Sequence, residues 1–188
     1  MIPSEEDAAS LHRKYGSDER IVRHCQTVAL VARSLAEEFQ RRGHAVNVKA
    51  VVAAAMLHDI GRSRIQTVRH GVEGASMVEK EGVDGKVVEI IQRHVGAGIS
   101  PEEAKSLGLP DLDYIPHTLE ERIVCFADKM VDSNRVRPFE EEVRRFRIKS
   151  HDVGRLLALK KGLQEELGED PEKIVFGKIK ESHLKAAD

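Results

Sequence analysis

The most constraining stretch of this 188-residue chain is an apolar run that ends on two polar side chains. Residues 51–57 read Val-Val-Ala-Ala-Ala-Met-Leu, and residues 58–61 read His-Asp-Ile-Gly. A helix made of such small and branched apolar residues must be buried. An imidazole and a carboxylate at its buried end are costly unless each is hydrogen-bonded or coordinated, and a divalent cation would satisfy both. The run therefore predicts a buried helix that brings His58 and Asp59 to a metal site.

Helix start and stop signals divide the rest of the chain. Ser4, Ser100 and Thr118 each begin a capping box, while Gly16, Gly43 and similar glycines follow apolar stripes of helical period. No segment alternates with period two, and there is no internal repeat. We expect an all-α fold, a compact helical bundle in one domain over residues 1–188. The expected helices span about 4–16, 17–43, 47–61, 71–82, 84–95, 100–108, 118–131, a charged segment after 135, 152–167 and 170–184.

Composition indicates an ordinary globular protein and gives little signal for nucleic acid. Hydrophobic residues make up 40% and charged residues 33%, which is too apolar for disorder. The formal charge is −2, so no global field attracts a polyanion. The charged helix at about 140–149 intersperses both signs, which favours a solvated face. We expect the C-terminal helices to pack on the core or to pair with another subunit in a homo-oligomer.

The cysteines and the N-terminal sequence predict a cytoplasmic location. Cys25 and Cys125 lie among apolar residues of separate helices, as buried thiols do, and no disulfide framework is present. The first residues lack a basic segment followed by an apolar one. No apolar run approaches the ~20 residues that span a bilayer. A soluble protein without a membrane partner is expected.

Four further residues are candidates to join His58 and Asp59. His24 borders the apolar stripe of its helix, and Asp128 interrupts an otherwise apolar helix face. His70 falls at a helix start and His94 in a last turn. Each of the three histidines has a plainer interpretation: a hydrogen-bonded core histidine for His24, a loop histidine for His70, and a partner of the helix dipole for His94.

This pattern resembles the HD superfamily of metal-dependent phosphohydrolases. The family has a His, then a His-Asp pair, then a distal Asp, which His24, His58, Asp59 and Asp128 match, and the pair continues in the HDIG form. The resemblance covers about residues 17–138. It implies an HD-type helical core there, with 139–188 as a C-terminal extension, and it makes the four matching residues ligands of one ion.

A finer similarity concerns the dinuclear members of that family. His70 and His94 look like the extra histidines of these members, in which the Asp of the pair, here Asp59, bridges two ions. The bacterial branch that cleaves diadenosine tetraphosphate is similar at Ala127-Asp128 with Arg135, and at His70-Gly71.

The chemistry that this resemblance implies is hydrolysis of a phosphate ester. Imidazoles and carboxylates suit Fe, Mn, Co, Ni or Zn, with one or two ions per chain. In the family, metal-bound water or hydroxide attacks phosphorus, here in a nucleotide or similar small phosphorylated substrate. Arg62, expected to act beside Asp59, is the best candidate phosphate ligand, and Lys129 and Arg135 are weaker ones. Each of the three is equally well read as a surface cation.

Two other functions are consistent with the sequence. A non-catalytic HD domain could bind a nucleotide or a partner and use its ion structurally, and a helical adaptor would carry its histidines incidentally. The remaining histidines have no constellation around them and are expected at the surface: His12, His44, His117, His151 and His183.

Overall fold

The computed structural model describes residues 1–148 and 153–185 of the chain. In this part the predicted all-α fold is confirmed, with helices at nearly every predicted position. In chain order the elements are α1 (Glu5–Lys14), α2 (Glu19–Arg41), α3 (Val48–Leu57), the 3-10 helix η1 (Ile60–Ser63), α4 (His70–Lys80), α5 (Gly85–Gln92), α6 (Pro101–Ser106), α7 (Leu119–Lys129), β1 (Val131–Asp132), β2 (Arg135–Val136), α8 (Phe139–Ile148), α9 (Val153–Leu167) and α10 (Pro171–Lys185).

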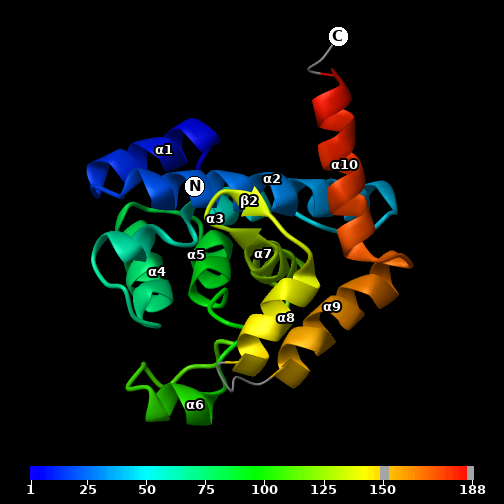
Figure 1. The fold of residues 1–188 in the computed structure, drawn as a ribbon. Coiled ribbons are helices and arrows are strands. Elements are labelled where there is room, and N and C mark those ends of the chain that lie inside the picture. The colour runs from blue at the N-terminus through cyan, green and yellow to red at the C-terminus, as the bar shows by residue number, and fades with distance from the viewer. Residues whose placement is uncertain (149–152, 186–188) are drawn as a thin grey trace.

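Helix α3 lies at the centre of the bundle. It packs against α2, α5, α7 and α1, so that helices surround it (Figure 1). Every residue from Ala50 to Leu57 is buried, as the apolar run predicts. Asn47 caps its N-terminus through a hydrogen bond from the Ala50 N–H to Oδ1. The central helix therefore ends inside the molecule and leaves its last residues facing the neighbouring helices.

Helices α4 and α5 cover one side of this end of α3. The 3-10 helix η1 packs on α4, and α4 packs on α5. The sequence predicts that the helix ends near Gly61 and that Arg62, Ser63 and Arg64 form a loop. The 3-10 turn instead continues the chain tightly, with the Arg62 N–H bonded to the Asp59 carbonyl at 2.9 Å.

A small hairpin follows α7 where no strand was expected. Val131 pairs with Val136 and Asp132 with Arg135, antiparallel, and Ser133 at the tip has φ 58°. Strands of two residues are too short to show alternation in the sequence, which explains why they were not predicted. The hairpin lies against α2 and brings its tip close to His24.

The C-terminal helices pack on the core, which is one of the two arrangements expected for them. Helix α9 packs on α7, α8 lies on α9, and α10 lies on α2 before it extends away from the body (Figure 1). Arg42, the C-cap of α2, donates hydrogen bonds to the Leu167 carbonyl and the Glu169 carboxylate at the α9–α10 turn. Among the described helices, none combines the length and the apolar character that a membrane span requires.

Candidate metal centre

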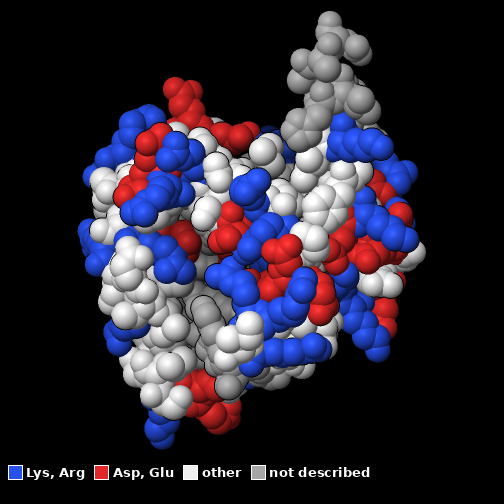
Figure 2. Space-filling model, in the orientation of Figure 1, with Lys and Arg blue, Asp and Glu red and all other residues white. Residues whose placement is uncertain are grey.

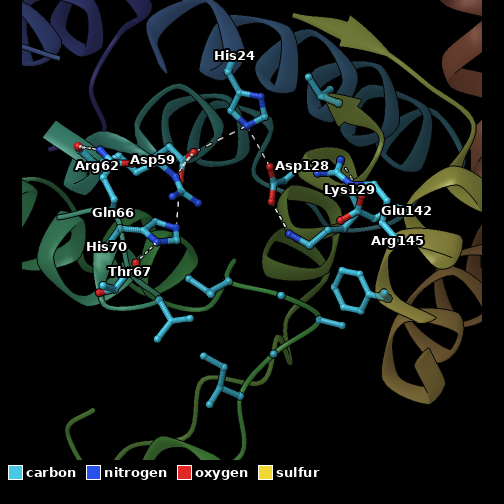
Figure 3. A pocket seen from close by; sticks show the side chains of 18 of the residues that line it. His24, Asp59, Arg62, Gln66, Thr67, His70, Asp128, Lys129, Glu142 and Arg145 are labelled. Atoms are coloured by element: carbon cyan, nitrogen blue, oxygen red, sulfur yellow. Dashed lines mark hydrogen bonds and ion pairs between the residues drawn. The ribbon is translucent and has the colours of Figure 1, made fainter. Parts of the chain in front are cut away.

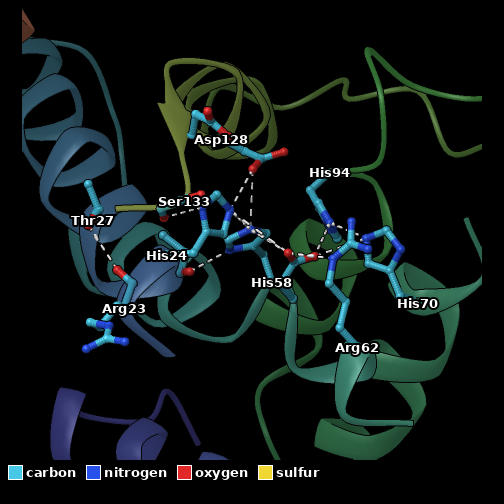
Figure 4. A network of polar contacts seen from close by, with 12 residues as sticks. Arg23, His24, Thr27, His58, Arg62, His70, His94, Asp128 and Ser133 are labelled. Carbon is cyan, nitrogen blue, oxygen red and sulfur yellow. Dashed lines mark hydrogen bonds and ion pairs between the residues drawn. The ribbon is translucent and has the colours of Figure 1, made fainter. Parts of the chain in front are cut away.

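The end of α3 places Asp59 in the lining of a cleft, with His58 buried beside it. His58 is fully buried and Asp59 is 6% exposed. His24 reaches them from α2 and Asp128 from α7, while His70 and His94 approach from the start of α4 and the end of α5 (Figure 4). The structure thus brings together all six predicted ligands, from five segments of the chain.

Backbone carbonyls fix the orientation of the four imidazoles. Each ring has its Nδ1 within hydrogen-bond distance of a carbonyl oxygen, so in the neutral ring Nδ1 donates and Nε2 is left as the acceptor that faces inward. The contacts are His24 to Ser133 at 3.0 Å, His58 to Ala55 at 2.8 Å, His70 to Thr67 at 2.7 Å and His94 to Ile91 at 2.6 Å.

The inward atoms form two adjoining groups. In the first, His24 Nε2 lies 3.3 Å from His58 Nε2 and 3.1 Å from Asp128 Oδ1, and Asp59 Oδ2 lies 3.9 Å from His24. In the second, Asp59 Oδ1 lies 3.1 Å from His70 Nε2 and 3.5 Å from His94 Nε2. His24, His58 and Asp59 in the first group, and all three residues of the second, lie close enough together to hold a metal ion. Asp128 adjoins the first group through His24 and His58. Asp59 belongs to both groups, with one carboxylate oxygen in each.

One atom shows that these residues fit a cation. Asp59 Oδ1 is buried and has no hydrogen-bond partner within the described chain. Its neighbours include the Nε2 atoms of His70 and His94, which carry no proton in a neutral ring whose Nδ1 donates to a carbonyl. A buried carboxylate oxygen beside two imidazole lone pairs is unfavourable unless a positive charge lies among them.

Neighbouring positive groups keep the carboxyls of Asp59 and Asp128 ionised despite their burial. Burial opposes ionisation of Asp128, but Lys129 and His24 outweigh it and hold the pKa of that carboxyl well below its ordinary value. Burial also opposes ionisation of Asp59, but interactions with neighbouring imidazoles, chiefly the charge of His58, outweigh it and keep the pKa of that carboxyl well below 3.8. Burial lowers the pKa of His94 to about 4, so this ring is neutral at pH 7. Two ionised carboxylates among imidazoles are what a divalent ion requires.

Gly61 explains how the second group is assembled. A Cβ atom at this position would lie 2.1 Å from the His70 carbonyl oxygen and 2.6 Å from the Gly74 nitrogen. Only glycine allows η1 to approach α4 this closely. The glycine of the His-Asp-Ile-Gly sequence therefore sets the distance between Asp59 and His70.

The cleft in front of the ligands has a volume of about 1070 Å³. His24, Asp59, His70 and Asp128 point into it (Figure 3). Five Lys or Arg residues and six Asp or Glu residues line it, and both signs mix on the adjoining face over α8 (Figure 2). Each of the five cations lies beside a carboxylate of the same lining: Arg20 with Asp18, Arg62 with Asp59, Lys129 with Asp128, Arg145 with Glu142 and Arg155 with Glu103.

The three predicted phosphate ligands differ in position. Arg62 lines the cleft but donates from Nε to Asp59 Oδ2 at 2.6 Å. Lys129 also lines it, is largely buried and pairs with Asp128. Arg135 lies exposed on β2 and is not among the lining residues. Arg145 and Arg155 line the cleft and were not predicted, because no sequence signal shows which face of a mixed-charge helix turns inward.

One of the histidines expected at the surface is buried. His12 is 1% exposed, with hydrogen bonds at both ring nitrogens. It lies four residues after buried Ala8, and this helical spacing could have identified it. His117 is exposed and pairs with Asp113, and His44 is half-buried against the Phe39 ring. His151 and the side chain of His183 lie outside the described residues.

Comparison with known proteins gives a family match and three informative relatives. The family model for the HD domain matches residues 21–131. Two proteins named tRNA (cytidine(56)-2'-O)-methyltransferase are similar to the chain. That of Thermoplasma volcanium is 35% identical over 93% of this chain and 51% of its own length, and that of Picrophilus torridus is 38% identical over 88% and 47%. The uncharacterized protein MJ0778 of Methanocaldococcus jannaschii is 42% identical over 68% of this chain and 76% of its own length. No solved structure matches.

These relatives correct the functional expectation. A phosphohydrolase of a nucleotide or another small phosphorylated metabolite was expected, without a nucleic-acid partner, but the two named relatives are RNA methyltransferases. The low net charge of the chain does not exclude RNA contact, because such contact depends on local cations and not on net charge. The chain spans about half the length of these methyltransferases.

Proposed function

The chain belongs to the HD domain family, and from this premise we propose that it is a metal-binding module that contacts tRNA during ribose 2'-O-methylation. The observation that carries the proposal is the similarity of nearly the whole chain to about half of two tRNA methyltransferases. Work on tRNA would place it in the cytoplasm.

We propose that this chain contacts the RNA and does not itself transfer the methyl group. Methyl transfer requires a bound methyl donor, whereas the ionisable side chains that converge in the cleft, beside its apolar lining, are imidazoles, carboxylates and cations. Such groups bind metal ions and phosphate. We assign the methyl donor to the other half of the relatives' length, which this chain would assist as a partner.

The proposed ligands form two adjoining ion sites. His24, His58, Asp59 and Asp128 would hold the first ion, and Asp59, His70 and His94 the second, with Asp59 as the bridge. The nitrogen and oxygen donors suit Fe, Mn, Co, Ni or Zn. Such ions neutralise charge on phosphate oxygens. Two divalent ions would also reverse the sign of a lining in which carboxylates outnumber cations by one.

The ion pairs in the cleft connect metal binding to RNA binding. Arg62 and Lys129 now neutralise Asp59 and Asp128, so little of their charge is available to a phosphate. When these carboxylates serve as metal ligands, Arg62 and Lys129 are no longer needed as their counter-ions. The planar guanidinium of Arg62 can then bind two phosphate oxygens. RNA affinity should therefore depend on the metal.

The test measures methylation in the organism that encodes the chain. We would delete the gene, isolate tRNA, and quantify 2'-O-methylcytidine at position 56 by nuclease digestion and mass spectrometry. The level should fall, and the wild-type gene should restore it while Asp59→Ala should not. A copy with His117→Ala, an exposed histidine outside the ligand set and the cleft lining, is the matched control and should restore methylation. Unchanged methylation in the deletion strain would contradict the proposal.

A further inference from the structure

His12 lies behind the metal ligands and bonds to the helix that carries them. Its Nε2 lies 2.7 Å from the carbonyl oxygen of Met56, two residues before His58. Its Nδ1 lies 2.8 Å from the hydroxyl of Ser17. The residue belongs to α1, outside the part of the chain that the family model matches. The contact between His12 and Met56 is therefore not part of the HD ligand pattern.

The turn after α1 fixes the His12 ring. Gly16 has φ +65°, its N–H donates to the Arg13 carbonyl at 3.2 Å, and the Ser17 N–H donates to the His12 carbonyl at 3.0 Å. These are the two hydrogen bonds of a Schellman motif. The turn folds Ser17 back over His12, so that the hydroxyl can donate to Nδ1. In the neutral ring Nε2 then carries the proton and donates to Met56.

The Met56 carbonyl lies in the last turn of α3, where carbonyl groups lack a hydrogen-bond donor within the helix. The last four carbonyls of a helix lack intrahelical donors, and buried ones must find others. At the end of α3, His58 Nδ1 donates to Ala55 and His12 Nε2 donates to Met56. Two imidazoles thus cap successive carbonyls of the turn from which His58 and Asp59 project.

From this geometry we infer that His12 is a positioning residue of the metal centre. By holding the Met56 carbonyl, it sets the direction in which the last turn of α3 presents His58 and Asp59. The inference rests on the metal sites of the proposed function, but it concerns a residue outside both ligand sets. Loss of an outer hydrogen bond that orients ligands typically lowers metal affinity by about 10–100-fold.

The test compares variants that keep or remove the donor. His12→Leu removes it, and His12→Gln retains an amide N–H that can reach the carbonyl. Ser17→Ala removes only the bond that orients the ring. Leu11→Ala weakens the packing of α1 without changing the Met56 contact, and it is the control for general destabilisation. Each purified protein would be titrated with Co²⁺, recording affinity, stoichiometry and the visible absorption spectrum of the bound ion.

The expected order of Co²⁺ affinities distinguishes a positioning role of His12 from a general loss of stability. His12→Leu should weaken Co²⁺ binding by about 10–100-fold and change the spectrum, while His12→Gln should recover most of both. Ser17→Ala should weaken binding in the wild-type background but add nothing to His12→Leu. Wild-type affinity and spectrum in His12→Leu would overturn the inference, as would an equal loss in Leu11→Ala. If the wild-type chain itself bound no Co²⁺, the metal part of the proposed function would fail and this inference with it.

Discussion

The Nε2 atoms of His70 and His94 lie 3.0 Å apart and share Asp59 Oδ1 as a neighbour. Because both Nδ1 atoms contact backbone carbonyls, two imidazole lone pairs and a carboxylate oxygen face one point. This arrangement makes the second group of ligands as suitable for a cation as the first.

The number of bound ions follows from this arrangement. We predict two ions per wild-type chain and about one in His94→Ala, because His94 contributes to the second group only. Elemental analysis of protein loaded with Mn²⁺ and freed of excess ion measures the ratio. His117→Ala, exposed and away from the ligands, should keep two. One ion in the wild-type chain, unchanged in His94→Ala, would show a mononuclear site.

The close approach of η1 and α4 predicts the effect of a single methyl group. Gly61→Ala places a Cβ against two backbone atoms of α4, so we expect a loss of about 1–3 kcal/mol in the free energy of unfolding. Gly85→Ala is the control, because a Cβ at Gly85 meets nothing within 4 Å. It should change stability by less than about 1 kcal/mol. Equal stability of the two variants by urea denaturation would argue against the tight contact.

How far the sequence predicts this site can be judged from particular residues. His24, His58, Asp59 and Asp128 were identifiable because they border, end or interrupt apolar stretches of helices, and periodicity places such residues toward the core. Arg145 and Arg155 could not be identified, because the sequence of a helix with both positive and negative residues does not show which of them line a cleft. The Ser133 contact with His24 depends on a hairpin too short for a periodic signal, and His12 was assigned to the surface for want of sequence neighbours.

Lys129 should stabilise the metal-free protein. It is the internal counter-ion of Asp128, and removing one partner of a buried pair costs about 3–5 kcal/mol. Lys129→Met should therefore lower the melting temperature in EDTA, and Mn²⁺ should raise it more than in the wild-type chain. Lys161→Met, at an exposed lysine of α9, is the control. Equal melting temperatures of Lys129→Met and wild type in EDTA would contradict this role.

The pair of arginines at the end of α2 predicts acid sensitivity. Arg41 and Arg42 lower the pKa of Glu38 to about 2, from an ordinary value of 4.5. A depressed carboxyl pKa stabilises the folded protein above the unfolded pKa, and this stabilisation is lost as the pH falls from about 4.5 to about 2. Glu38→Gln should thus be less stable than wild type at pH 6, and the difference should shrink below pH 4.5. A difference in the free energy of unfolding that stays constant from pH 6 to pH 3 would refute this assignment, with Glu165→Gln as the exposed control.

The most direct measurement of the central claim is the affinity of the purified chain for a tRNA transcript, by fluorescence anisotropy at fixed salt and Mg²⁺. It would compare protein loaded with Mn²⁺ and freed of excess ion, protein stripped with EDTA and dialysed, and Asp59→Ala treated in both ways. We predict that the loaded wild-type protein binds at least about tenfold more tightly than the stripped protein, because phosphate contacts gain the metal charge and Arg62. Asp59→Ala should bind weakly after either treatment. Equal affinity of loaded and stripped wild-type protein would contradict the account.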